Sequence, residues 1–359
     1  MIKPLRGFSK AYDNVFERKF ILVGPYPPPR GGISIHIERL LDVLAEAGMD
    51  FHLFNHGSYE GRHITATKKK YRWWVGFFLA SLIQRRLIRR EHVVFHFHLF
   101  ADLQFAYLLF FTRMVSNRVI ITIHNEDLFR RSGPRQQVIV WAVRHMHAAK
   151  IITVSKNLND YLLDIIAGRT SFIPAYIRPR HRNPITIPRP NDSNEEWIAC
   201  SVWRLREDYV DRYGLDLCFT LLRDFPRLVL FLFVGDKENS DVNLVKNRCT
   251  EGVRRRVRVY FDCNLTDYIG NFDLFVRPNR QDGYGVSIVE ALDNGVPVLA
   301  SDTCYRADGT VLFQNGNYGE FKAKTSEMLD KSARQNGALA TGLNFENQLL
   351  DIYRTVSQS

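Results

Sequence analysis

The chain has 359 residues, which is enough for two domains with a sizeable core each. Its net charge of +11 is uneven, because residues 1–190 hold 29 Lys and Arg against 13 Asp and Glu, and the remainder holds 20 against 25. No segment reaches the roughly 18 apolar residues of a membrane span, and no long apolar run follows Met1, so neither a spanning segment nor a secretory signal is expected. The basic half favours an anionic partner: a bilayer surface, a lipid diphosphate or nucleic acid.

Strand and helix patterns alternate along the first half. Apolar runs predict strands at residues 20–24, 49–54, 93–97, 119–123 and 150–154, and helical spacing predicts helices at 33–47, 71–90, 102–115 and 136–148. This alternation is typical of a parallel, doubly wound sheet.

Five prolines between residues 174 and 190 interrupt the alternation and predict a linker over residues 176–194. A second α/β series follows, with strands expected at 197–202, 228–234, 257–261, 274–276 and 296–300, and helices at 215–223, 287–293 and 345–356. Two such domains in series can face each other across a cleft.

All five cysteines lie in the second half, and none forms a C-x-x-C pair. This usage favours reduced core thiols in a cytoplasmic protein over a disulfide frame or a zinc site.

Residues 282–301 combine two carboxylates with a glycine-rich turn, a predicted helix and an apolar strand. Gly283 and Gly285 lack a Cβ, so the amides of this turn can approach a ligand closely. Unpaired amides at a helix start near Ser287 suit a phosphate. With Asp282 and Glu290 as acceptors for sugar hydroxyls, the pattern indicates a sugar-nucleotide site. The alternative is an ordinary β-α-β unit with solvated acids.

The stretch from Asp273 to Ser301 resembles the donor-binding signature of family 4 of the retaining GT-B glycosyltransferases. That signature has a carboxylate, seven residues, a Glu, an Ala and a Gly-x-Pro-Val strand. Asp282 stands here for the usual first Glu, whereas Glu290 and the rest of the pattern match. The resemblance implies an α/β GT-B fold with two Rossmann-like, doubly wound domains that face each other across a cleft.

The domain boundaries follow from this resemblance. We expect an acceptor-binding domain at residues 1–175, the linker at 176–194 and a nucleotide-sugar-binding domain at 195–340. Residues 341–359 would form a helix that crosses back to the first domain.

Two further places carry over to phosphate binding by resemblance. Gly31 and Gly32 lie between the first strand and the first helix, where the family's Gly-Gly approaches the donor phosphates and the acceptor. The alternative is a tight turn that needs a positive φ. Arg204-Leu205 matches an Arg-Leu whose Arg clamps the diphosphate, but Tyr213-Gly214 stands where the family has Lys-Gly. Arg206 or Arg212 would then be the second cation.

Three histidines lie in or directly after predicted strands. The resemblance places His124 near the transferred sugar, although Asn125 replaces the family's usual Asp. Strand alternation puts His96 and His98 on one face, where they are either satisfied core residues or acceptor contacts. The family acts without a metal, and no His-x-x-x-His helix is present, so no metal ligands are expected.

These observations predict a retaining glycosyltransferase that moves a sugar from a nucleoside diphosphate sugar to a glycan. The acceptor would be a lipid-linked precursor of a bacterial surface polysaccharide such as O-antigen, lipopolysaccharide or capsule. Glu290 would hold the ribose and Asp282 the donor sugar, with His124 nearby. Gly32, Arg204 and the loop amides of Gly283, Tyr284, Gly285 and Val286 would stabilise the departing diphosphate.

We expect no metal or other cofactor and no nucleic-acid partner. The protein would be cytoplasmic and peripheral on the inner face of the plasma membrane, through residues 68–90, where cations flank an apolar run with Trp and Phe. A solvated helix face is the alternative for that segment. Two other functions remain open: a sugar-nucleotide epimerase of the same fold, which needs no acceptor, and a non-enzymatic basic module, whose binding would survive Glu290→Ala.

Overall fold

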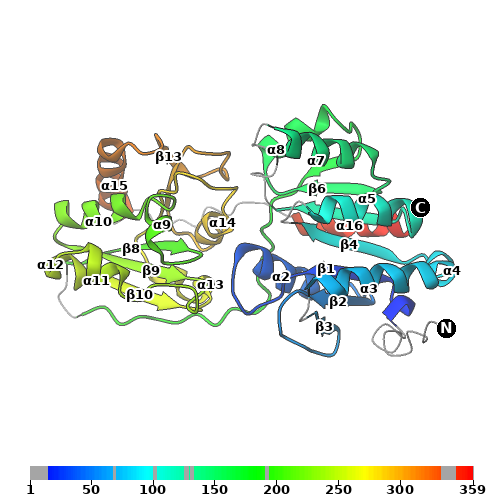
Figure 1. The fold of residues 1–359 in the computed structure, drawn as a ribbon. Coiled ribbons are helices and arrows are strands. Elements are labelled where there is room, and N and C mark those ends of the chain that lie inside the picture. Colours follow the sequence, from blue (N-terminus) through cyan, green and yellow to red (C-terminus); the bar gives the residue numbers. More distant parts are fainter. Residues whose placement is uncertain are drawn as a thin grey trace. The chain divides into compact units, whose positions relative to one another are not determined.

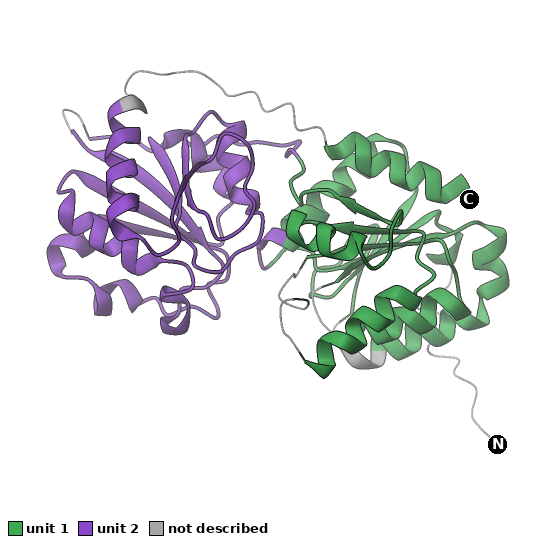
Figure 2. Cartoon of the chain, turned by 90° about the horizontal axis from the view of Figure 1, so that it is seen from above, with its two compact units in different colours: residues 1–28, 33–177, 344–359 green, residues 29–32, 178–343 purple. Residues whose placement is uncertain are grey.

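The computed structural model describes residues 15–67, 70–99, 103–124, 129, 133–190, 194–332 and 345–358. The chain divides into two compact units (Figures 1 and 2). Unit 1 comprises Met1–Pro28, Ile33–Ile177 and Asn344–Ser359, and unit 2 comprises Pro29–Gly32 and Arg178–Leu343.

Unit 1 contains a 7-stranded parallel sheet in the order β3-β2-β1-β4-β5-β6-β7. Strands β1, β4 and β5 are buried along their whole length, as expected for a parallel sheet with helices on both faces. Its strands are β1 (Phe20–Gly24), β2 (Phe51–Asn55), β3 (Ile64–Ala66), β4 (Val94–Leu99), β5 (Val119–Ile123), β6 (Lys150–Thr153) and β7 (Thr170–Phe172). Its helices are η1 (Val15–Glu17), α2 (Gly32–Glu46), α3 (Lys70–Ile83), α4 (Arg85–Arg90), α5 (Leu103–Met114), α7 (Pro134–His145), α8 (Lys156–Leu163) and α16 (Phe345–Gln358).

Strand alternation divides the core of unit 1 into two layers. Phe95 and Phe97 of β4 point to the layer that α3, α5 and α7 cover. Val94 points to the opposite layer, which contains apolar residues of α2 and α16. His96 and His98 continue the Val94 row, and His96 contacts Tyr353 of α16 while His98 contacts His36 of α2. The sequence therefore places these two histidines under α2 and α16.

Helix α16 belongs to unit 1, although it follows unit 2 in the sequence (Figure 2). Its buried residues are Leu349, Tyr353 and Val356, which recur at helical spacing. The Tyr353 ring meets Phe20 of β1 edge-on at 5.3 Å. The chain end therefore completes the hydrophobic core of unit 1.

Unit 2 contains a 6-stranded parallel sheet in the order β10-β9-β8-β11-β12-β13. Its strands are β8 (Glu196–Val202), β9 (Leu228–Val234), β10 (Val257–Phe261), β11 (Leu274–Arg277), β12 (Val298–Ser301) and β13 (Val311–Phe313). Its helices are α9 (Glu207–Val210), α10 (Leu215–Asp224), α11 (Leu244–Arg248), α12 (Glu251–Arg254), α13 (Leu265–Tyr268), η2 (Ile269–Asn271), α14 (Val286–Asp293) and α15 (Tyr318–Ser332). The prediction of two parallel, Rossmann-like sheets is confirmed.

The described part of the predicted linker packs on unit 2 from residue 178 onward, whereas Ile177 belongs to the core of unit 1. Residues 178–190 form no helix or strand. The Ile185 amide donates to the Asp267 carbonyl at 2.7 Å, and Arg182 pairs with Asp293. This part of the predicted linker is therefore held on unit 2 by hydrogen bonds and ion pairs.

Some elements differ from those the sequence predicts. The single helix expected at residues 71–90 is two helices, α3 and α4, separated at Gln84. Helix α15 was not predicted, because polar residues make up most of its sequence and leave a weak apolar pattern. Strands β3, β7 and β13 were also missed, since three-residue edge strands carry almost no alternation signal. None of the described cysteines forms a disulfide.

Candidate functional site

The turn between β11 and α14 carries the sequence motif. Gly285 has φ of 82° and directly precedes α14, so a left-handed backbone conformation sets the helix start. A Cβ at Gly285 would lie 3.1 Å from the Nε atom of Arg277. A Cβ at Gly283 would meet nothing within 4 Å, so the turn backbone is unobstructed there. The Ile288 amide donates to the Gly285 carbonyl at 3.0 Å, so the amides of Val286 and Ser287 are the ones at this helix start that can receive an anion.

Asp282 is held in a buried ion-pair cluster. Arg277 donates from Nε and Nη2 to its two carboxylate oxygens at 2.5 and 2.7 Å. Arg306 donates from Nη1 to Oδ2 at 2.6 Å. Burial opposes ionisation of this carboxyl, but the charges and hydrogen bonds of Arg277 and then Arg306 outweigh it and lower its pKa to about 2. The expected acceptor of sugar hydroxyls thus already accepts three hydrogen bonds from arginines.

Two serine hydroxyls extend this cluster to the helix start. Arg277 Nη1 donates to Ser287 Oγ at 3.0 Å and lies 3.4 Å from Ser201 Oγ. The Ser201 hydroxyl donates to Ser287 Oγ at 3.1 Å. Ser287 lies in the first turn of α14 and is buried. Strands β8 and β11 therefore each contribute a polar side chain, Ser201 and Arg277, that contacts Ser287 at the start of α14.

The second carboxylate of the motif, Glu290, lies one turn further along α14. It is buried, and its backbone carbonyl accepts a hydrogen bond from the Asn294 side chain at 2.7 Å. Tyr284 is also buried and stacks on Tyr305 with ring centroids 6.1 Å apart. Burial raises the pKa of the Tyr284 hydroxyl, so it stays protonated. The glycine turn thus contains one ring of a stacked aromatic pair.

Arg204 follows β8 at the carboxyl end of the same sheet. Its Nε donates to Asp236 Oδ2 at 2.7 Å, and Asp236 follows the neighbouring strand β9. The Asn239 amide also donates to Asp236. Burial opposes ionisation of Asp236, but these hydrogen bonds lower its pKa below the ordinary value. Arg204 is therefore a positioned cation at the edge where such sheets bind ligands.

Tyr213 occupies the position at which a lysine was expected. Burial raises the pKa of its hydroxyl, and the charge of Arg277 acts on it in the opposite direction. Gly214 has φ of 63°, and a Cβ there would lie 2.1 Å from the Pro278 carbonyl oxygen, so only glycine fits. The buried cation near Tyr213 is therefore Arg277, from a neighbouring strand.

Arg206 and Arg212, the two arginines considered as replacements for the expected lysine, each contact a side chain of their own segment. Arg206 is ion-paired with Asp208 at 2.9 Å, and both side chains are exposed. The guanidinium of Arg212 lies 5.9 Å from the Tyr209 ring centroid. The Arg212 backbone nevertheless lies beside the turn that contains Asp282, because its carbonyl accepts from the amides of Arg280 and Gln281 at 2.9 and 3.5 Å.

The histidines form a separate cluster in unit 1, at the carboxyl ends of β4 and β5. His98 Nδ1 and His124 Nε2 are 3.0 Å apart, and His36 Nδ1 lies 2.9 Å from the Ala175 carbonyl oxygen, to which it donates. Burial lowers the pKa of His36 to about 4 and that of His98 and His124 well below the ordinary value. Asn125, which follows His124, lies outside the described residues.

The neutral rings leave nitrogen lone pairs available. His36 Nε2 and His98 Nε2 are buried without a hydrogen-bond partner among the described residues. One nitrogen from each of His36, His98 and His124 lies within 4.8 Å of the others, which is close enough for a shared transition-metal ion. His96 is instead fully engaged, with Tyr353 at Nδ1 and Thr122 at Nε2. The cluster can donate to or accept from a sugar without carrying charge.

Gly31 and Gly32 lie at the start of α2, as the strand–turn–helix pattern predicts. Gly31 precedes the helix, and Gly32 is its first residue. A Cβ at Gly32 would meet nothing within 4 Å, so the helix start is open there. The local geometry needed for an anion site is present.

Arg277, Arg306 and Ser201 were not among the predicted site residues. Arg277 ends a buried strand, where a charged residue needs a partner, and this was the available signal. Arg306 and Ser201 come from other strands or loops, and their proximity to Asp282 depends on the sheet order. Short-range motif reasoning therefore found the turn but not the cations beneath it.

Comparison with known proteins identifies the family of this chain. Two family models match: Glycosyltransferase Family 4 over residues 30–181 and Glycosyl transferases group 1 over residues 214–331. The O-antigen biosynthesis glycosyltransferase WclY of Escherichia coli is 25% identical over 207 residues, which are 52% of this chain and 55% of that protein. The chain thus spans about half the length of this relative.

Solved structures show the same fold. Sucrose-phosphate synthase from Thermosynechococcus elongatus gives a TM-score of 0.67 at 16% identity, covering 95% of this chain and 97% of that one. Anabaena Alr3699/HepE in complex with UDP-glucose gives 0.66 at 13% identity, covering 94% and 98%. The predicted GT-B fold is confirmed. The chain belongs to the family 4 glycosyltransferases, also described as glycosyl transferases group 1.

Proposed function

We propose that this protein is a retaining glycosyltransferase that moves a sugar from a nucleoside diphosphate sugar to a lipid-linked glycan. The observation that carries the proposal is the β11–α14 turn, where open backbone amides at a helix start lie above buried arginines. This combination suits a diphosphate. A similar fold holds UDP-glucose in HepE, and WclY is described as an O-antigen glycosyltransferase.

In the proposed reaction, the bond between the anomeric carbon and the diphosphate oxygen breaks, and the diphosphate leaves with the electron pair. An acceptor hydroxyl attacks the anomeric carbon from the same face and gives its proton to the leaving phosphate oxygen. Arg204, Gly32 and the amides of residues 283–286 stabilise the charge that grows on the diphosphate. Glu290 accepts hydrogen bonds from the ribose, and neutral His124 bonds to the transferred sugar. Positioned cations remove the need for a metal.

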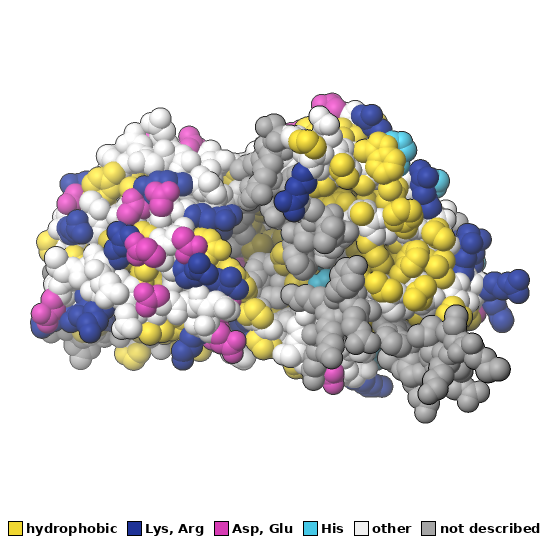
Figure 3. Space-filling view, viewed as in Figure 1, with side chains coloured by type: hydrophobic (Ala, Val, Ile, Leu, Met, Phe, Trp, Pro, Cys, Tyr) yellow, Lys and Arg dark blue, Asp and Glu magenta, His cyan; other side chains and the backbone are white. Residues whose placement is uncertain are grey.

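A lipid-linked acceptor requires that the protein contact a membrane surface, and an apolar face of unit 1 supports such contact. From Trp73 to Ile83 helix α3 is almost entirely apolar, with Phe77 stacked on Phe111 of α5 on its inner side. Its outer side exposes Ile83 at 78%, and α7 exposes Trp141 at 53%. Other exposed large apolar residues on α3, α5 and α7 are Val75, Leu79, Phe110, Met114 and Val138. Figure 3 shows hydrophobic side chains gathered on this unit.

This apolar face differs in detail from the segment that the sequence suggested. Trp73 and Trp74 are partly buried and pack on the core instead of facing outward. Lys68 and Lys69 lie outside the described residues. Contiguous apolar surface of this kind marks interaction sites. Among the described helices, none has the length and apolar character required to cross a bilayer.

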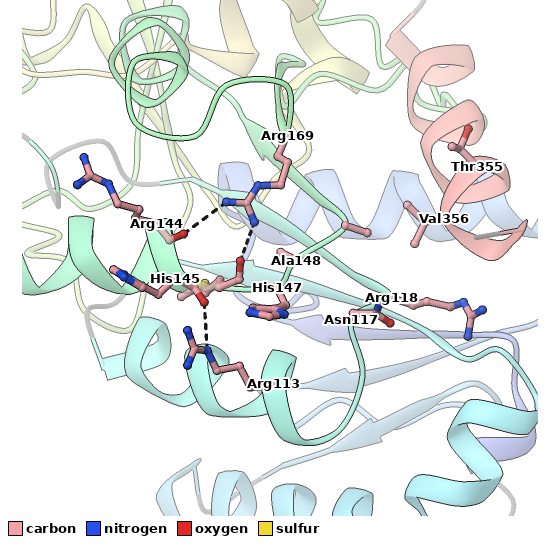
Figure 4. Close-up of a pocket in the computed structure, with 12 residues that line it drawn as sticks. Arg113, Asn117, Arg118, Arg144, His145, His147, Ala148, Arg169, Thr355 and Val356 are labelled. Atoms are coloured by element: carbon pink, nitrogen blue, oxygen red, sulfur yellow. Dashed lines mark hydrogen bonds between the residues drawn. The ribbon is translucent and has the colours of Figure 1, made fainter.

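Arginines lie beside the apolar face. Helix α4 ends with Arg89 and Arg90. A hollow of about 720 Å³ at the ends of α5 and α7 is lined by Arg113, Arg118, Arg144 and Arg169, with no acidic residue among its described lining (Figure 4). Arg113 and Arg169 donate to backbone carbonyls of residues 144–146. Apolar side chains bordered by cations suit an anionic bilayer, which is where a lipid-linked acceptor lies.

The proposal is tested by a thermal-shift screen with UDP, GDP, ADP and dTDP sugars, because binding to the folded state raises the melting temperature. We expect one nucleotide series to give a clear shift. Incubation of that donor with lipid-linked glycan should then give a product with the donor's anomeric configuration, in the presence of EDTA. Absence of any shift would contradict the proposal, and conversion of the donor sugar without acceptor would indicate an epimerase.

A further inference from the structure

The ion-pair cluster beneath the glycine turn has an excess of positive charge. Two guanidinium groups, Arg277 and Arg306, share one carboxylate, Asp282. The exposed fractions of the three side chains are 15%, 1% and 9%. The other hydrogen-bond partners of the two arginines are hydroxyls and backbone carbonyls. Burying a charge costs free energy unless the charge is paired, so a bound anion would stabilise this cluster by neutralising its excess positive charge.

The geometry directs the excess charge toward the start of α14. Arg277 uses Nε and Nη2 on Asp282, which leaves Nη1 for Ser287. Ser287 Oγ accepts from Arg277 and shares a hydrogen bond with the Ser201 hydroxyl; with Ser201 as the donor, the Ser287 hydroxyl hydrogen has no acceptor among the described residues. Since Ser287 is buried in the first turn of α14, that hydrogen is available for an anion bound at the helix amides.

We propose that Arg277 is the second cation of the diphosphate site and acts on the phosphate through Ser287. It supplies from β11 the charge that Tyr213 cannot supply. Asp282 is then a positioning residue that fixes the guanidinium, and it is not a ligand of the donor sugar. This inference rests on the proposed function, because it names the residues that hold the diphosphate of that donor.

The inference separates two roles for Asp282. A ligand of the sugar matters only when the sugar is present. A residue that positions Arg277 matters equally for the nucleoside diphosphate and for the nucleoside diphosphate sugar. Both carboxylate oxygens of Asp282 accept hydrogen bonds from Arg277. Asp282→Asn removes the negative charge and one of these acceptors, so the guanidinium of Arg277 is no longer fixed.

The experiment uses the full chain and isothermal titration calorimetry with the nucleoside diphosphate that gives the largest thermal shift among UDP, GDP, ADP and dTDP. Each variant is titrated with that diphosphate, with its nucleoside and with its diphosphate sugar. We expect Arg277→Gln to weaken diphosphate binding about tenfold or more and to leave nucleoside binding unchanged. Arg255→Gln, which removes the same charge from an exposed site in unit 2, is the matched control and should bind as the parent does.

Further variants guard against unfolding. Ser287→Ala keeps the ion pairs and should also lose diphosphate affinity but not nucleoside affinity. Asp282→Asn should weaken the diphosphate and the diphosphate sugar by the same factor. Unchanged diphosphate binding by folded Arg277→Gln or by Ser287→Ala overturns the inference, as does an Asp282→Asn defect confined to the sugar nucleotide. If the parent protein binds none of the four diphosphates, the proposed function itself fails.

Discussion

The two sheets have the same parallel architecture but opposite chemistry at their carboxyl ends. In unit 1 that edge carries His36, His98 and His124, and burial lowers the pKa of all three, so they are neutral near pH 7. In unit 2 it carries Arg204 and Arg277, each held by an aspartate. Neutral polar groups suit sugar hydroxyls, whereas fixed cations suit phosphates. The fold thus provides the position, and the side chains that strands, loops and helices bring to that edge decide the ligand chemistry.

The largest expected loss of activity comes from replacing Glu290, the carboxylate of helix α14 in unit 2. Glu290→Gln should lower kcat/KM about 100-fold, because a hydrogen bond to a charged acceptor is replaced by a weaker one at the ribose. Initial rates with the identified donor measure this. Glu251→Gln, on exposed α12, is the control and should keep parental rates. Full activity of Glu290→Gln would contradict the proposal that unit 2 binds the donor.

The next effect concerns the Arg204–Asp236 pair. Arg204→Gln should weaken nucleoside diphosphate binding about thirtyfold through loss of a charged hydrogen bond. It should also lower the Tm by a few degrees, since Asp236 stays buried without its cation. The double variant Arg204→Gln/Asp236→Asn should recover Tm but not affinity. Recovery of both would mean that Arg204 only stabilises the fold.

A smaller effect is a pH dependence of stability that the histidine cluster gives to unit 1. The folded pKa of His36 is lowered to about 4 from 6.5, so the unfolded state binds more protons between these values. Its contribution to stability is complete above pH 6.5 and is lost as the pH falls toward 4. The slope is at most about 1.4 kcal/mol per pH unit for each histidine.

Urea unfolding of the protein between pH 7.5 and pH 4.5 measures this slope. His36→Gln should flatten it, while His92→Gln, at an exposed turn, should not. Asp282 does not contribute to the slope between pH 7.5 and pH 4.5. Its pKa is about 2 when folded, so the stability that it provides is constant in this range and is lost only below pH 3.8. An unchanged slope in His36→Gln would show that folding does not lower the pKa of His36.

The smallest effect concerns the apolar face of unit 1. Trp141→Ser should reduce binding to phosphatidylglycerol vesicles roughly fivefold, since an exposed aromatic ring no longer enters the interface. Sedimentation with vesicles measures it. Binding to phosphatidylcholine vesicles should be weak for both proteins. Tyr305→Ser, an exposed aromatic of unit 2, is the control and should bind vesicles as the parent does.

The sequence by itself determined the two parallel sheets, the motif from Asp282 to Ser301 and the helices α2, α3, α5, α7, α10, α14 and α16. These depend on apolar periodicity and glycine turns, which act over a few residues. Strand alternation was also sufficient to put His96 and His98 on one face.

Only the tertiary structure decided which charges meet. Arg306 reaches Asp282 from 24 positions away, and Ser201 reaches Ser287 from 86. His36 meets His98 because α2 covers that face of β4. Such pairs depend on sheet order and helix placement, which set distances between segments that no local pattern connects. For this reason the sequence indicated Asp282 as a sugar ligand, and the fold surrounds it with arginines.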